Sequence, residues 1–542
     1  MNAVVAPNRE AVLREQGVIH SALWAAAGDA IGWITELAQE GTVQHRTGQT
    51  SVKSPIPWKR TIGGRAGVRV DLPAGTYSDD TQLRLAVSRA IRSNGAFDVE
   101  AFARVELTVW QSYSLGAGLG SKAAASNLSK RGVNWFSNFY NVRGQSYFNG
   151  GGNGAAMRVQ PHSWANNRQD GSLEIDVLRD AIVTHGHPHG FGGAFVHALA
   201  LQDALQTRAP VSLDGLFRIV DRLIDIPEFV SGDRQLDAFW KPIWEQSSGT
   251  TLRQAVTELR SETLQVLDRL TPFVEQGPDA YKQTLDSLGV LHSRYRGSGI
   301  RTAIAASLAT YQFRMGPPEE LLIATANELE SDTDTIGTMA GALAGALCDR
   351  APDWPVQDGD YIRAEARRLA RIARGERRGG FAYPDLAKWS PPSNQSDAVV
   401  RIDDGFGLAG FGPISPVSDA YDSGDFVWQW FSLPFGQTIL VKRRAALAPS
   451  TSLQQAPANR RSSYGEHQPD LLPLAANRAD DQPSQPHRPD WLTFAMDRVL
   501  ASEFDDRVIG RFVKDSVDRF GADSAVALVG MIARTRLASA RK

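Results

Sequence analysis

The chain has 542 residues, with 58 lysines and arginines against 60 aspartates and glutamates and a formal net charge of -2. This length is too great for one compact core, so we expect roughly two to four folded units. The balanced charge neither attracts the protein to nucleic acid nor repels it. No stretch approaches the roughly 20 apolar residues of a membrane span, and the N-terminus lacks a signal peptide's apolar core. We therefore predict a cytoplasmic protein that acts on a small or local substrate.

Most of the chain has the pattern of a helical protein. Residues 10 to 388 consist of Ala- and Leu-rich segments with helical spacing, separated by Gly and Pro, and predict one mostly α-helical domain. Residues 41 to 77 are rich in glycine and proline and predict a long surface loop. Helices are predicted at 20 to 40, 83 to 92, 191 to 206, 252 to 274 and 336 to 349.

The composition changes after Pro391. Residues 391 to 447 contain short aromatic and β-branched runs and predict a small β-rich appendage. Residues 448 to 490 are rich in Pro, Gln, Ser, Asn and Asp, which is typical of a disordered linker. Residues 491 to 542 predict a C-terminal helical segment with one apolar face.

Two acidic clusters each open a predicted helix. The first is Ser78-Asp79-Asp80-Thr81-Gln82, and the second is Ser331-Asp332-Thr333-Asp334-Thr335. Either one alone fits an ordinary acidic N-cap, because carboxylates and hydroxyls accept hydrogen bonds from the first turn of a helix. Two acidic helix N-termini in one chain are harder to explain as ordinary N-caps.

The helix after the second cluster carries glycines at 337, 341 and 345, four residues apart on one face. Each costs roughly 1 kcal/mol of helix propensity, so we expect a second helix to approach this face closely. If that packing brings the two clusters together, four like charges repel unless cations neutralise them. Carboxylates and hydroxyls without sulfur or imidazole favour Mg²⁺.

Two further elements accompany the clusters. Asp29 and Glu36 lie seven residues apart on one face of the helix predicted at 20 to 40, where Asp29 is surrounded by apolar and small residues and needs a partner. Gly150 to Arg158 and the earlier Leu115-Gly116-Ala117-Gly118 are glycine-rich turns. Such turns let backbone N–H groups approach a diphosphate, although many glycine-rich turns are only turns.

In this order, the elements resemble the ADP-ribosylglycohydrolase family over roughly residues 15 to 350. The family's Gly-Asp-x-x-Gly motif with a later glutamate is matched by residues 28 to 36, and its Ser/Thr-Asp-Asp-Thr motif by residues 78 to 81. Its Gly-Asn-Gly-x-x-Met-Arg, Thr-His and Asp-x-Asp-Thr motifs are matched by residues 152 to 158, 184 to 185 and 332 to 335. The resemblance implies an all-α fold of compact, orthogonally packed helices.

The resemblance also implies a site. Two Mg²⁺ ions, or Mn²⁺, would be held by Ser78, Asp79, Asp80, Asp332, Asp334 and Thr335. Glu36 and Asp80 would be catalytic, and the metals would hold the distal ribose through its hydroxyls. Residues 37 to 77 would correspond to a loop that moves in some members to admit substrate. Substrate would be bound by Gly116, Gly118, Gly152, Asn153, Gly154 and His185.

Three functions remain open from the sequence. The first is metal-dependent removal of ADP-ribose from a modified protein, a nucleic acid or a small molecule. The second is an ADP-ribose-binding or blocking protein with little turnover. The third is an interaction protein whose appendage and terminal helices dock a partner. Intact oxygen ligands at the six metal positions, together with Glu36, favour the first.

Overall fold

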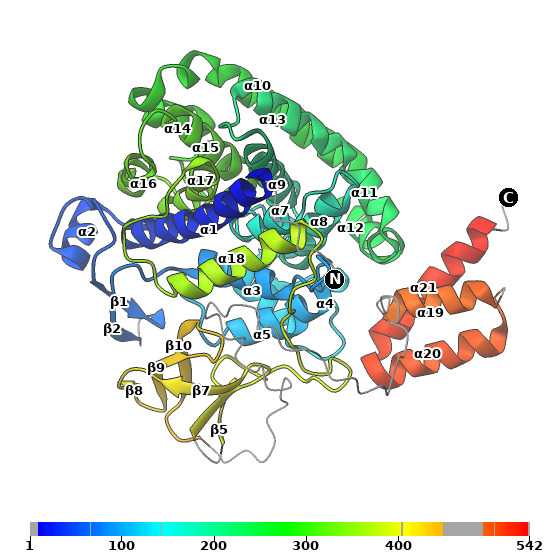
Figure 1. Cartoon of the computed structure of the whole chain (residues 1–542). Coiled ribbons are helices and arrows are strands. Elements are labelled where there is room, and N and C mark those ends of the chain that lie inside the picture. Colours follow the sequence, from blue (N-terminus) through cyan, green and yellow to red (C-terminus); the bar gives the residue numbers. More distant parts are fainter. Residues whose placement is uncertain are drawn as a thin grey trace, which may run out of the picture.

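The computed structural model describes residues 9–64, 67–142, 144–402, 405–447, 491–502 and 504–539. The fold is mostly helical, as predicted, with a small sheet at one side and three helices at the C-terminus (Figure 1). The helices before the sheet are α1 (Arg9–Thr35), α2 (Glu40–Thr47), α3 (Asp79–Ala90), α4 (Val99–Ala101), α5 (Leu107–Trp110), α6 (Leu119–Leu128), α7 (Gln160–Ala165), α8 (Ser172–Thr184), α9 (Pro188–Thr207), α10 (Leu213–Asp221), α11 (Ile226–Gly232), α12 (Lys241–Ser248), α13 (Leu252–Val274), α14 (Tyr281–Leu288), α15 (Gly299–Gln312), α16 (Pro318–Asn327), α17 (Thr333–Leu347) and α18 (Gly359–Ala373).

Helix α1 is the central element, and it packs along α17 (Figure 1). The predicted glycine face forms this contact. A Cβ atom added at Gly341 would lie 2.4 Å from the carbonyl oxygen of Trp24, and one at Gly345 would lie 2.6 Å from that of His20. From the other side, a Cβ at Gly28 would lie 2.2 Å from the carbonyl oxygen of Gly337. The two backbones therefore touch without intervening side chains, as the glycine spacing predicted.

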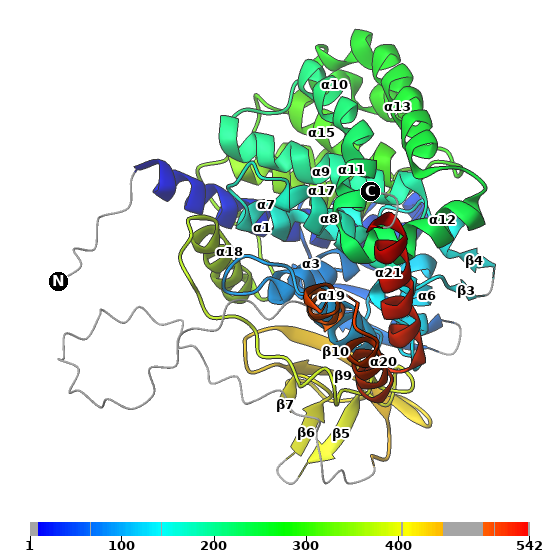
Figure 2. The same cartoon turned by 90° about the vertical axis from the view of Figure 1, so that its right-hand side faces the viewer.

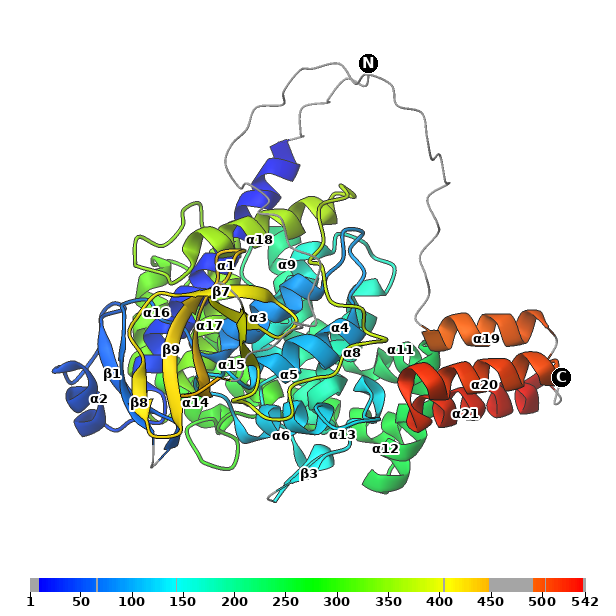
Figure 3. The same ribbon diagram turned by 90° about the horizontal axis from the view of Figure 1, so that it is seen from below.

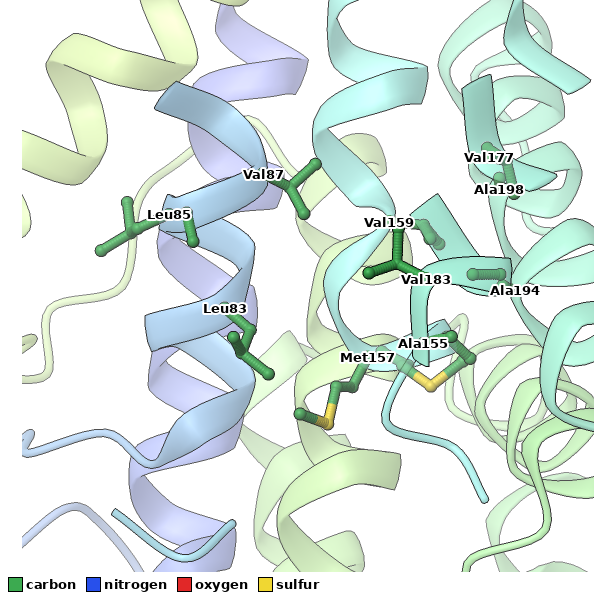
Figure 4. Packing of buried hydrophobic residues seen from close by; sticks show 14 of the residues in the cluster. Leu83, Leu85, Val87, Ala155, Met157, Val159, Val177, Val183, Ala194 and Ala198 are labelled. Atoms are coloured by element: carbon green, nitrogen blue, oxygen red, sulfur yellow. The ribbon is translucent and has the colours of Figure 1, made fainter. Parts of the chain in front are cut away.

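The hydrophobic core continues from α3 towards α8 and α9. Leu83 and Val87 point from α3 towards the segment that carries Met157 and Val159, while Leu85 points the other way (Figure 4). All five side chains are buried. This packing fixes α3 against the glycine-rich turn that ends at Arg158.

The prediction of a long surface loop at 41 to 77 is wrong. Helix α2 occupies its start, and strands β1 (Trp58–Ile62) and β2 (Val68–Leu72) form an antiparallel hairpin in its middle. The glycines lie at element ends, with Gly48 capping α2 and Gly63 and Gly64 at the hairpin turn. Alternate side chains of β2 are buried, a strand pattern that the surrounding glycines and prolines concealed.

The predicted β-rich appendage is an antiparallel sheet, as expected. Its order is β10-β9-β7-β6-β5, and β8 pairs with β9. Figure 3 shows β8 and β9 beside the β1–β2 hairpin, and β2 contacts β8. The strands are β5 (Val399–Ile402), β6 (Gly405–Leu408), β7 (Gly412–Pro416), β8 (Tyr421–Ser423), β9 (Phe426–Ser432) and β10 (Thr438–Arg444). A two-stranded ribbon, β3 (Asn141–Val142) and β4 (Gln145–Ser146), lies elsewhere in the helical part.

A buried arginine connects the appendage to the helices. Arg89 of α3 donates two 2.8 Å hydrogen bonds to Glu106 and one of 2.7 Å to Gln437, which precedes β10. Arg89 and Glu106 have almost no exposed side-chain surface. Glu106 belongs to the helical segment Phe102–Glu106, so the bond to Gln437, and not the ion pair, joins Arg89 to the region that carries the sheet.

The C-terminal segment is helical, as predicted, and comprises α19 (Trp491–Ala501), α20 (Asp506–Phe520) and α21 (Ala522–Ser539). Helix α21 contacts the short segment Leu236–Trp240, and Figure 2 shows α19, α20 and α21 grouped together. The linker predicted at 448 to 490 lies outside the described residues. The boundaries between folded units that the sequence suggested stay predictions.

Among the described residues, none of the helices has the length and apolar character that crossing a membrane requires.

Candidate functional site

Asp29 organises the start of α3. Its side chain is fully buried in α1, and it accepts hydrogen bonds from the backbone N–H of Ser78 at 2.8 Å and of Thr81 at 2.9 Å. The Thr81 hydroxyl donates a third bond of 2.6 Å, and Arg84 donates to that hydroxyl in turn. The partner that a buried acid requires is therefore the first turn of α3, whose free N–H groups need acceptors.

The first acidic cluster lies on that turn. Ser78 is the N-cap of α3 and accepts a 3.3 Å bond from the backbone N–H of Asp80. Asp79 and Asp80 are buried, and the pKa of each carboxyl is raised well above its usual range. Burial is the main cause, followed by repulsion from Glu36 for Asp79 and from Asp29 for Asp80. Among the described residues, the Oδ1 atom of Asp80 has no hydrogen-bond partner.

The second cluster opens α17. Asp332 is its N-cap residue, and Asp334 and Thr335 lie in its first turn, both buried. The pKa of Asp334 is raised well above its usual range by burial and then by the charges of Glu36 and Asp80. Thr333 donates 2.9 Å to the carbonyl oxygen of Gly32, so the start of α17 is fastened to the last turns of α1.

Glu36 directly follows α1 and is held by the β1–β2 hairpin. Arg60 of β1 donates from both terminal nitrogens to Glu36 Oε2 at 3.1 Å. Its guanidinium stacks over the rings of Trp33 and Trp58, 5.1 and 5.8 Å from the ring centroids. Arg46 donates to the backbone carbonyl of Glu36 at 3.1 Å. The pKa of Glu36 is raised by burial, and Arg60 opposes this rise.

The predicted substrate-binding residues lie close to these acids. Gly116 adopts φ of +82°, and a Cβ there would lie 2.9 Å from Trp33 Nε1 and 3.1 Å from Asp79 Oδ1, so a side chain would collide with the cluster. Gly118 is the N-cap of α6. Asn153 donates a 2.9 Å bond to Asp332 Oδ2, which joins the second glycine-rich turn to the second cluster.

A single cleft of about 370 Å³ collects these groups from separate parts of the chain. Ser78 is fully buried and does not line the cleft, but its hydroxyl lies 3.2 Å from Asp80 Oδ2. The sequence analysis missed Gln145, Asn149 and Ser121, which line the cleft and belong to no motif. It also missed Arg60, which only the fold brings to Glu36. The predicted residues that line the cleft are Glu36, Asp79, Asp80, Gly116, Gly118, Gly152, Asn153, Gly154, His185, Asp332, Asp334 and Thr335.

The fit of a divalent cation can be judged from these side chains. In the described ranges, no group of three or more His, Cys, Asp or Glu side chains is arranged as a preformed metal site. The chemistry of the donors nevertheless suits a hard cation, because Asp79, Asp80 and Asp334 are buried and each is repelled by neighbouring carboxylates. The Asp80 oxygen without a partner needs a donor or a cation as well.

Fold and cleft thus define a helical protein with an acid-lined ligand site. The sequence model described as ADP-ribosylglycohydrolase matches residues 15–379, and the chain belongs to that family. The resemblance inferred from the motifs is confirmed.

The relatives whose names state an activity are distant in sequence. An ADP-ribosyl-[dinitrogen reductase] glycohydrolase of Rhodospirillum rubrum is 30% identical over 31% of this chain and 50% of its own length. An ADP-ribosylhydrolase ARH3 of Xenopus tropicalis is 27% identical over 50% of this chain and 73% of its own length. The chain thus spans half of the first relative. A solved structure titled "ADP-ribosylglycohydrolase-related protein complex" covers 66% of this chain and 99% of its own, at 21% identity and a TM-score of 0.39.

Proposed function

We propose that the protein hydrolyses the N- or O-glycosidic bond between ADP-ribose and an acceptor, with two divalent cations, Mg²⁺ or Mn²⁺. The observation that carries this proposal is the single cleft in which both acidic helix starts, Glu36 and the glycine-rich turns meet. Membership of the family and the names of the two relatives support it.

The cations would be held by the oxygen side chains of Ser78, Asp79, Asp80, Asp332, Asp334 and Thr335. When bound, such cations orient and polarise ribose hydroxyls and stabilise developing charge. Glu36 lies at the edge of this cluster, and its carboxylate accepts the proton of a water whose oxygen attacks the anomeric carbon of the ribose. The bond from that carbon to the acceptor breaks, and the acceptor leaves with a proton.

The other wall of the cleft would bind the rest of ADP-ribose. Gly118, Gly152 and Gly154 expose backbone close to the ligand space, and Gly118 stands at the N-terminus of the ten-residue helix α6. Backbone N–H groups at a helix start favour the negative charge of a diphosphate. Asn153 is held by Asp332 and would contact the ribose between the two walls.

The test is a substrate panel. The full-length protein is incubated with ADP-ribosyl-arginine, ADP-ribosyl-serine, O-acetyl-ADP-ribose and ADP-ribosylated nucleic acid, each with Mg²⁺ and with a chelator. We expect Mg²⁺-dependent release of free ADP-ribose from at least one of them. Tight ADP-ribose binding without release from any of the four would identify a binding or blocking protein instead.

A second candidate concerns the C-terminal helices. Val517 of α20 and Val526 and Val529 of α21 are large apolar residues with 47%, 61% and 47% of their surface exposed. We propose that this surface docks a protein partner. Removal of residues 448 to 542 should then leave the cleavage rate unchanged and abolish binding of that partner, whereas a lost cleavage rate would assign the helices to the enzyme itself.

Arg60→Gln tests the placement of Glu36. A protonated Glu36 cannot accept a proton, so activity should fall as the pH drops through its pKa. Arg60 favours the carboxylate and lowers this pKa, so its removal should move the acid limb of the kcat/KM profile to higher pH. We also expect kcat at the optimum to fall about tenfold, because a misplaced general base loses part of its roughly 10²- to 10⁴-fold contribution.

Lys59→Gln is the matched control. Lys59 is the neighbouring residue of β1, and its side chain pairs with Asp71 on the surface, where both are more than half exposed. Side chains of adjacent strand residues point to opposite faces, so this change spares Glu36. An acid limb that stays in place in Arg60→Gln would contradict the role of Glu36 as the base.

A further inference from the structure

His185 directly follows α8, and in the described part of the chain only one of its ring nitrogens has a hydrogen-bond partner. The ring is buried, and Nδ1 lies 2.7 Å from the hydroxyl oxygen of Thr184. Nε2 lies beside the second glycine-rich turn, 3.6 Å from the position of a Cβ on Gly152, and both Gly152 and His185 line the cleft. Which nitrogen carries the proton decides whether His185 donates to a ligand or accepts from one.

The hydrogen bonds of Thr184 decide this question. Arg158 donates from Nη2 to the Thr184 hydroxyl oxygen at 2.9 Å, and a guanidinium can only donate. The hydroxyl has one hydrogen, and among the described residues its other neighbour is His185 Nδ1. If Nδ1 carried a proton, the hydroxyl hydrogen would point at no acceptor in a buried site, which is costly. Thr184 therefore donates to an unprotonated Nδ1.

Arg158 cannot turn away from Thr184. It donates 2.9 Å bonds to the Asp180 carboxylate and to the Asp180 carbonyl, and a third to the carbonyl of Gly154 in the turn that lines the cleft. Arg158 and Asp180 are fully buried. The same cation disfavours a second positive charge nearby, and burial together with Arg158 lowers the pKa of His185 to about 3.

We propose that Thr184 and Arg158 are positioning residues that hold His185 as a neutral imidazole protonated at Nε2, so that it donates a hydrogen bond to an acceptor oxygen of the ligand in the cleft. The identity of that ligand as ADP-ribose rests on the proposed function; the tautomer does not. A series of hydrogen bonds thus runs from Asp180 through Arg158 and Thr184 to His185. By fixing the direction of the Thr184 hydroxyl, Arg158 leaves the proton of His185 on Nε2, where the ring can donate to a ligand.

The first measurement needs no substrate. Protein labelled with ¹⁵N-histidine is compared with Thr184→Val and Thr184→Ser by NMR at pH 7, and His185 is assigned from His185→Gln. We expect the wild type and Thr184→Ser to show the neutral Nε2–H tautomer. In Thr184→Val, whose side chain has a similar shape but no hydroxyl, the resonances should move towards a mixture of tautomers. An Nδ1–H tautomer or an imidazolium in the wild type would overturn the proposal, as would unchanged resonances in Thr184→Val.

The second measurement is ADP-ribose affinity by calorimetry. Loss of one well-formed hydrogen bond should raise Kd about tenfold in Thr184→Val, and Thr184→Ser should restore it. The control is Thr263→Val, a buried threonine of α13 whose hydroxyl bonds only to Leu259 of its own helix among the described residues. An equal loss of affinity in Thr263→Val would overturn the specific role of Thr184. If the wild type shows the Nε2–H tautomer yet binds no ADP-ribose, the proposed function fails and the assignment of the tautomer stands.

Discussion

Replacement of Asp80 by Asn should abolish the response of this protein to Mg²⁺. The amide keeps the size of the carboxyl but removes a charge that is buried beside Asp29, Asp79 and Asp332. Mg²⁺ at about a hundred times its Kd would stabilise the wild type by about 2.7 kcal/mol. We expect differential scanning calorimetry to show this gain in the wild type and none in the variant. Release of ADP-ribose should fall at least about a hundredfold, since cation assistance is worth several kcal/mol.

The same substitution should behave differently in chelator, which separates a lost metal site from a damaged fold. Without cations the four acids repel, so removing one charge should leave the melting temperature unchanged or raise it. A variant that melts much earlier in chelator would show a folding defect and would contradict this explanation. The control is Asp419→Asn, an exposed residue, which should keep both the Mg²⁺ response and the activity.

The parts of the site that depend on local sequence patterns could be predicted. The acidic clusters both open helices, as their positions before apolar runs indicated, and the spacing of Gly337, Gly341 and Gly345 correctly predicted a close helix contact. Asp29 was expected to need a buried partner because its neighbours are small or apolar. The structure identifies that partner as the first turn of α3.

Contacts between distant segments were not predictable in this way. Nothing in the run from Trp58 to Ile62 marks Arg60 as a partner of a glutamate 24 residues earlier, and the strand itself was hidden among glycines and prolines. Likewise, Arg89 and Gln437 are 348 residues apart, and their contact depends on the sheet folding back against α3. No periodicity encodes such pairs, because they are set by tertiary packing.

The contact between the hairpin and the sheet also decides which deletion can test the role of the C-terminal helices. The position of a Cβ on Gly63 lies 3.3 Å from the ring of Trp428 in β9, so the appendage supports the hairpin that carries Arg60. Deletion from residue 391 would remove this support together with Gln437, which accepts a hydrogen bond from Arg89. A loss of activity after that deletion would therefore not show that the terminal helices act in catalysis, and truncation after residue 447 is the cleaner experiment.

Substitution of Gly341 should show that the site depends on the contact between α1 and α17. On helix propensity alone, alanine would stabilise this position by about 1 kcal/mol. Its Cβ, however, would lie 2.4 Å from the carbonyl oxygen of Trp24, a backbone atom that cannot rotate away. Overpacking costs about 1 to 3 kcal/mol, so the clash should win. Gly341→Val adds two further carbons at the same point, and we expect a loss of about 3 kcal/mol or more in urea unfolding.

Gly510 provides the opposite series. It lies inside α20, is exposed, and has no atom within 4 Å of the position of a Cβ. There alanine should stabilise the helix relative to glycine, and valine should do so less, because only propensity acts. At Gly341 the stability should instead fall from glycine to alanine to valine. Because Asp334 and Thr335 lie in the first turn of α17, the response to Mg²⁺ should also become weaker in the Gly341 variants as the side-chain volume increases. The same order at both glycines would mean that α1 and α17 are not held together by backbone contact, and that the two acidic clusters are placed by other interactions.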